Sequence, residues 1–458
     1  METTGEAAVA GPQHLGRGPV REPGPARERG PVPERDLSVD LARIGCLLAV
    51  VAVHVGMVGI GGADGAVAVT SPLTELSWFA VGTWFAQVMP LFFVLGGYGA
   101  HFSLSRAAER GTPDHEHLRS RVLRLGLPAL PFFAVMAVLG GVLVLAGVPD
   151  EMAAPALDGA GDPLWFMAAF LICQGFAPAQ HRLLARHGRR GLLLTTAALL
   201  AAVVAVDGLR HAAVAAGGTD LPGLLNMLTV WPLLQLWGMA LARGLLTPRR
   251  AGTALWAGVA VVGFGATAAL AQAPWYGPDM LANLNPPTLP LLTVGLMHLA
   301  LFQLLRPALR RIARARAVQA VLLVVGRQAM HLYLWHLAVV IALNGALWFV
   351  GAGPEPGSAL WWWTRLPVWA GVVLLTLALT WRAAGLERVS PRPADGLGVR
   401  VAAVAALVLA MLPNLAVTRL GLDLPLALLG TVCTGLAVLL AWVPPGARGR
   451  PRRQPRTG

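Results

Sequence analysis

The sequence has little charge and no lysine. Only 13% of its 458 residues are charged, against about 25% in an ordinary soluble protein. All 36 basic residues are arginine, and they outnumber the 23 acidic residues to give a formal net charge of +13. The arginines fall between long apolar runs and line no single polar face, so nucleic acid is not an expected partner. The low charge and the hydrophobic fraction of 56% argue against a soluble globular enzyme and favour a polytopic membrane protein.

Cysteine is equally scarce. Cys46, Cys173 and Cys433 lie far apart, each within an apolar run. This spacing excludes a disulfide scaffold and contains no CxxC or Cys/His pattern of the kind that closes a zinc site. The cysteines therefore predict no zinc site.

Both ends of the sequence lack the large apolar residues that a folded core requires. Residues 1–34 and 446–458 are rich in Pro, Gly and Arg, which predicts two disordered tails. The first tail has no apolar segment of the signal-peptide type, so we do not expect it to be a secretory signal.

Between the tails, apolar stretches of about 17–25 residues recur, the length that crosses the hydrocarbon core of a bilayer. Twelve spans are predicted, at 41–61, 79–103, 125–147, 163–180, 191–207, 223–242, 252–272, 288–305, 328–350, 366–381, 397–416 and 424–443. They must be helices, because lipid offers no partner to the amides of an open strand. The predicted fold class is an all-α polytopic membrane bundle.

The distribution of arginine predicts the orientation of the bundle, since positively charged segments stay on the cytoplasmic side. If the N-terminus is inside, the inside segments hold 31 arginines and the outside loops hold three, at positions 210, 365 and 419. Both termini are therefore expected in the cytoplasm, with the protein in the cell membrane.

Ionisable side chains within the spans are candidate functional residues. Arg43 and His54 are 11 residues apart on the first span, which places them on one stripe of a helix about 16 Å apart. Snorkelling explains Arg43 equally well. His54 is expected near the bilayer midplane, where its alternative role is a structural hydrogen bond to another helix.

Two further clusters carry charge or hydrogen-bonding groups. At the start of the third span lie Arg119, Arg121 and Arg124, which positive-inside topology alone would also explain. Arg121 and Arg124 are one helical turn apart, so both guanidinium groups can meet one polyanion. The ninth span carries Arg327, His331, Tyr333 and His336, of which Arg327 and His331 are expected to share a helix face.

Five blocks of the sequence together resemble the integral-membrane acyltransferase family 3. They are DLARIGCLLAVVAVH at 40–54, MPLFFVLGGYGAHFSLSR at 89–106, RVLRLGLP at 121–128, DPLWFMAAFL at 162–171 and HLYLWHL at 331–337. The resemblance covers about 37–340, and within it little likeness is seen over 190–285.

The resemblance implies an enzyme that moves an acyl group from cytoplasmic acyl-CoA, a co-substrate, to a hydroxyl of a carbohydrate, a glycolipid or another envelope or secondary-metabolite acceptor. It implies an acyltransferase core at 35–384, followed by additional transmembrane helices at 385–445. It assigns His54 as the general base, and it assigns Arg43, Arg121 and Arg124 to the acyl donor. Possible acceptor-site or packing residues are Asp40, Trp165, Tyr333 and His336. The resemblance implies no metal and no cofactor other than the co-substrate.

The sequence departs from the family pattern in three respects. Gly96 replaces a common serine, Gln328 and Ala329 replace a small hydroxyl residue, and the two spans after 390 exceed the usual ten. A second function consistent with the residues is a non-enzymatic membrane carrier or flippase of a lipid-linked or anionic molecule, with Arg43, His54 and the ninth-span residues lining its pathway. A third alternative is a degenerate member of the family with only a scaffold role.

Overall fold

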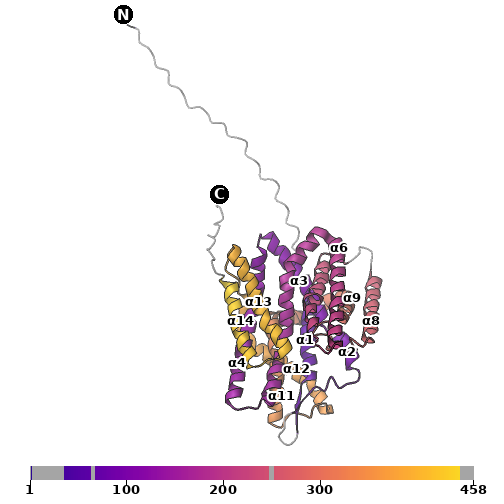
Figure 1. The fold of residues 1–458 in the computed structure, drawn as a ribbon, viewed down its shortest axis with the longest axis vertical. Coiled ribbons are helices and arrows are strands. Elements are labelled where there is room, and N and C mark those ends of the chain that lie inside the picture. Colours follow the sequence, from indigo (N-terminus) through magenta and orange to yellow (C-terminus); the bar gives the residue numbers. More distant parts are fainter. Residues whose placement is uncertain (1, 3–35, 63–67, 247–251, 444–458) are drawn as a thin grey trace. The chain divides into compact units, whose positions relative to one another are not determined.

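The computed structural model describes residue 2 and residues 36–62, 68–246 and 252–443. Apart from Glu2, the two predicted tails lie outside these ranges. The elements are α1 (Leu37–Met57), β1 (Gly59–Gly61), β2 (Ala68–Thr70), α2 (Phe79–Ala86), α3 (Met89–Glu109), α4 (Asp114–Leu145), α5 (Asp150–Gly161), α6 (Leu164–Ala215), η1 (Leu221–Leu228), α7 (Val230–Ala242), α8 (Thr253–Ala271), α9 (Leu289–Ile312), α10 (Arg316–Arg327), α11 (Ala329–Phe349), α12 (Ala359–Thr380), η2 (Trp381–Arg388), α13 (Leu397–Leu420) and α14 (Leu424–Trp442). The described residues from Leu37 to Val443 belong to one helical unit (Figure 1).

Eleven helical segments of the described chain are long and apolar enough to cross a membrane. One of them includes both the fourth and the fifth predicted spans, because α6 continues through them with only Gly188 out of helical geometry. Gly188 has a φ of +50°, which glycine adopts readily, so the two spans meet at a kink without a loop. The prediction of an all-α polytopic membrane bundle is confirmed.

The first predicted span is displaced by four residues at each end. It was expected at 41–61, and α1 runs from Leu37 to Met57, so His54 lies in the last turn of the helix and not in its middle. Glycine is a poor helix former, and the glycine-rich sequence that follows Met57 forms the strand β1. This strand pairs with β2 in a short antiparallel hairpin.

Helices α3 and α7 cross at two glycines. A Cβ atom at Gly97 of α3 would overlap the carbonyl of Gln235, and one at Gly238 of α7 would overlap the carbonyl of Val94. The backbones therefore touch at this crossing, which only residues without a side chain permit. Around it packs the core, which includes the fully buried Trp231.

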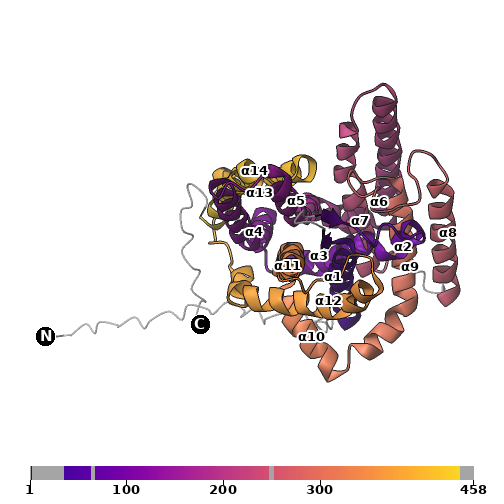
Figure 2. The same cartoon turned by 90° about the horizontal axis from the view of Figure 1, so that it is seen from below.

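The additional helices α13 and α14 lie against the family-like part of the bundle. Figure 2 shows α13 and α14 beside α4, on the side of the bundle away from α8. Arg119, which has no exposed surface, donates hydrogen bonds to the carbonyls of Ala441 (2.8 Å) and Trp442 (3.1 Å). These carbonyls end α14 and lack helical partners, so Arg119 caps the helix.

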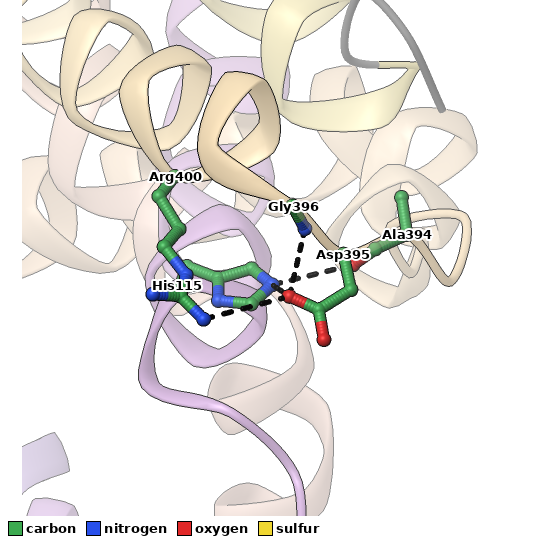
Figure 3. Close-up of polar contacts among 5 residues, drawn as sticks. All are labelled: His115, Ala394, Asp395, Gly396 and Arg400. Atoms are coloured by element: carbon green, nitrogen blue, oxygen red, sulfur yellow. Dashed lines mark hydrogen bonds and ion pairs between the residues drawn. The ribbon is translucent and has the colours of Figure 1, made fainter. Parts of the chain in front are cut away.

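Contacts at both ends also hold the helical hairpin formed by α13 and α14. Near the start of α4, the Nε2 atom of His115 lies 3.2 Å from the carbonyl oxygen of Ala394 and 3.8 Å from the Asp395 carboxylate. The same carboxylate accepts a hydrogen bond from the backbone of Gly396 and faces Arg400 at 3.9 Å (Figure 3). At the other end of the hairpin, Arg419 forms an ion pair with Asp220 at 2.6 Å.

The helix ends define two sides of the bundle. The first side is the one on which α1 and α4 begin and α3 ends. The second side is the one on which α1 ends and α11 contacts strand β1 of the β1–β2 hairpin. Arg119 binds the end of α14 on the first side, and Arg419 binds Asp220 on the second side.

Candidate active site

His54 and His336 form a direct contact between α1 and α11. Nδ1 of His54 lies 2.7 Å from Nε2 of His336, and the two rings stack with their centroids 5.0 Å apart. His336 is fully buried and His54 is partly exposed. The fold therefore brings into contact two histidines that lie 282 positions apart in the sequence.

The hydrogen bonds of His336 assign the tautomers of both rings. Nδ1 of His336 lies 2.6 Å from the carbonyl oxygen of Tyr333 and 3.2 Å from that of Leu332. Carbonyl oxygens only accept, so Nδ1 of a neutral His336 carries the proton and its Nε2 is an acceptor. His54 then donates from Nδ1, and its Nε2 presents a lone pair that meets no hydrogen-bond partner within the described residues.

Trp165 and Tyr333 belong to the aromatic core that adjoins this pair. The ring of Tyr333 lies 5.9 Å from that of His336 and 4.5 Å from that of Phe166. Trp165 is buried between Phe166 and Trp231. Trp165 therefore packs in the core, while Tyr333 packs there and also borders the histidine pair.

Arg43, Arg121 and Arg124 lie close together toward the first side. Arg43 is on α1, with its guanidinium over the Phe92 ring at 5.4 Å. Arg121 is partly buried and donates to Ser103 of α3 at 2.6 Å, and both Arg43 and Arg124 are within electrostatic range of it. Like charges repel, so this grouping favours an anion between them. Asp40 lies in the first turn of α1, three residues from Arg43.

The structure separates other residues that the sequence grouped. Arg119 caps α14 and Arg121 contacts α3, although only one residue lies between them in the sequence. Arg327 and His331 do not share a helix face, because α10 ends at Arg327 and α11 begins at Ala329. The interruption is at Gln328, whose side chain accepts a hydrogen bond from Thr380 at 3.0 Å. This departure from the family pattern thus joins α11 to α12.

Three histidines that the sequence did not single out adjoin the arginine group. They are His101 of α3, His117 of α4 and His181 of α6. His117 accepts a hydrogen bond from Nε of Arg121 at 3.4 Å, and the rings of His101 and His181 lie 5.2 Å apart. No sequence spacing links residues on three helices, so only the packing reveals the cluster. Within the described ranges, no group of three or more His, Cys, Asp or Glu side chains is arranged to hold a metal ion.

The comparison with protein families assigns the chain to a family. Residues 36–385 match the family model described as acyltransferase domain, that of acyltransferase family 3. The chain belongs to this family. The acyltransferase matches over most of its length, and the residues after 385, which include α13 and α14, lie outside the matched region. Comparison with curated proteins and with solved structures found no match. The family assignment supports an enzyme and not the non-enzymatic carrier.

Proposed function

We propose that the acyltransferase moves an acyl group from cytoplasmic acyl-CoA to a hydroxyl of a carbohydrate, a glycolipid or another envelope or secondary-metabolite acceptor, with His54 as the general base. The observation that carries the proposal is the contact of His54 with His336. It leaves Nε2 of His54 unprotonated and without a hydrogen-bond partner among the described residues, which is the state a general base requires.

The histidine pair supports a balanced transfer step. Nε2 of His54 takes the proton of the acceptor hydroxyl as its oxygen attacks the thioester carbonyl. The imidazolium that forms is stabilised by the hydrogen bond from its Nδ1–H to His336, as an oriented partner stabilises the histidine of a serine hydrolase. The carbon–sulfur bond then breaks, and the proton passes from His54 to the leaving thiolate, giving free CoA and the acyl ester.

Tyr333 is the candidate donor to the tetrahedral oxyanion. Its ring borders His336, and its hydroxyl has no hydrogen-bond partner in the part of the chain that the structure describes. A preorganised donor in a water-poor site stabilises developing negative charge strongly. Trp165 is a packing residue in this proposal.

Arg43, Arg121 and Arg124 bind the phosphates of the donor in this proposal. Guanidinium groups form strong, charge-assisted hydrogen bonds with phosphate. Arg43 and His54 share α1, and their separation of about 16 Å along the helix is of the order of a pantetheine arm. Phosphates held by the arginines would therefore leave the thioester within reach of His54.

The purified acyltransferase tests the assignment of His54. Release of CoA from acetyl-CoA is followed in the presence of acceptor-containing membranes for wild type, His54→Gln and His54→Ala. We expect both variants to bind CoA and to lose turnover by a factor on the order of 10²–10⁴. Gln can keep a structural hydrogen bond but cannot take a proton near pH 7. Wild-type turnover by His54→Gln would contradict the role of general base.

A further inference from the structure

The three histidines on the first side lie next to the arginine group and extend it. His117 contacts Arg121, and His181 lies within electrostatic range of both His117 and His101. Nε2 of His181 also lies 3.2 Å from the hydroxyl of Ser105. Four helices thus contribute polar groups to a connected row that begins at Arg43 on α1.

Arg243 completes the row. It directly follows α7, is exposed, and lies within electrostatic range of His101 and His181. No carboxylate is hydrogen-bonded or ion-paired to Arg121, Arg243 or the three histidines within the described ranges. Cationic groups and imidazoles that pair with no carboxylate form an anion-binding arrangement.

One buried atom of the row also lacks a partner. Nδ1 of His101 is inaccessible to solvent and forms no hydrogen bond with any described residue. A buried polar atom without a partner costs free energy, so such atoms in a native fold call for an explanation. A ligand group that reaches His101 would supply the missing hydrogen bond.

From these observations we propose that His101, His181 and Arg243 bind a second anionic group of the donor, the 3′-phosphate on the ribose of coenzyme A. This inference rests on the proposed function, since it takes acyl-CoA as the donor. In coenzyme A, the order from the thioester is pantetheine, pyrophosphate, then the 3′-phosphate. The protein repeats this order as His54, the group of Arg43, Arg121 and Arg124, and then His181 with Arg243.

The test compares the binding of CoA and of 3′-dephospho-CoA to the whole protein in detergent by calorimetry. A charge-assisted contact with phosphate predicts that wild type binds CoA about 10-fold or more tightly than 3′-dephospho-CoA. Arg243→Gln removes the charge, and His181→Phe keeps a ring beside His101 but removes both nitrogens. Each variant is expected to bind CoA only as well as 3′-dephospho-CoA, with the affinity for 3′-dephospho-CoA unchanged.

Arg186→Gln is the matched control, since Arg186 is an exposed arginine of α6 outside the row. It should keep the preference for CoA. Equal affinities of wild type for the two compounds would overturn the 3′-phosphate site while leaving the donor proposal intact. A preference that survives in both Arg243→Gln and His181→Phe would overturn it as well. If wild type bound neither compound, the proposed donor itself would be wrong, and this site with it.

Discussion

His54 and His336 share one hydrogen bond of 2.7 Å, and the direction of that bond is set from the far side of His336 by the carbonyl of Tyr333. The helix that carries the second histidine thus decides which nitrogen of the first is free. This dependence makes His336 a positioning residue for the proposed base.

Replacement of His336 tests this dependence. His336→Leu removes the acceptor, so His54 loses its fixed tautomer, and we expect kcat to fall by a factor on the order of 10²–10⁴ with the KM for the donor unchanged. His336→Gln keeps an amide oxygen that can accept from His54 and should recover part of kcat. Steady-state kinetics with acetyl-CoA measure both effects. A wild-type kcat in His336→Leu would show that His336 serves packing alone.

Arg121 and Arg124 are expected to act on donor affinity. Arg121→Gln and Arg124→Gln each remove a charge-assisted bond to phosphate, worth about 1.5–3 kcal/mol, so the affinity for CoA should fall roughly 10- to 150-fold in each variant. Arg106, an exposed arginine in the last turn of α3, is the control, and Arg106→Gln should bind CoA as wild type does. Unchanged CoA affinity in Arg121→Gln would leave membrane topology as the only explanation of that arginine.

The close crossing of α3 and α7 predicts that one added methyl group at the crossing lowers the stability of the protein. In Gly238→Ala the new Cβ meets the carbonyl of Val94, so the helices must separate, at a cost of about 1–3 kcal/mol or more. Gly265→Ala on α8 is the control, because nothing lies within 4 Å of the added atom. The melting temperature of the purified protein should fall in Gly238→Ala and stay near that of wild type in Gly265→Ala. Equal melting temperatures would contradict the close crossing.

The arginine asymmetry predicts cytoplasmic termini. With 31 of 36 arginines in the segments predicted to lie inside, a reporter that is active only outside the cytoplasm should give no signal when fused after residue 458. The same reporter inserted between α11 and α12, after Gly353, should be active. The reverse pattern would place the proposed donor groups on the wrong side of the membrane.

The sequence was sufficient for the helices and insufficient for their contacts. Length and hydropathy locate a span to within several residues, which is why α1 was predicted but shifted, and why His54 was expected near the midplane and lies in the last turn. Periodicity places Arg43 and His54 on one helix, and α1 contains both. It does not reveal that the fourth and fifth spans join at Gly188 without a loop, or that His54 contacts His336. These features depend on backbone geometry and on packing between distant segments.

Arg119 and Arg121 illustrate the same limit at short range. Both were expected in one basic cluster at the start of the third span, yet Arg119 contacts α14 and Arg121 contacts α3. Their directions follow from the neighbours of α4, and the sequence of α4 alone does not contain that information. His101, His181 and Arg243 could not be grouped from the sequence for the same reason.

The cap that Arg119 forms has a consequence for the biogenesis of the protein. The ribosome completes α4 long before it synthesises Ala441 and Trp442, the residues whose carbonyls accept from this buried guanidinium. A buried charge without acceptors is costly, so α4 cannot reach its final packing before α14 has been synthesised. The helix that carries Arg121 therefore takes its final orientation only after α14 has entered the membrane, and the proposed donor site is assembled after that event.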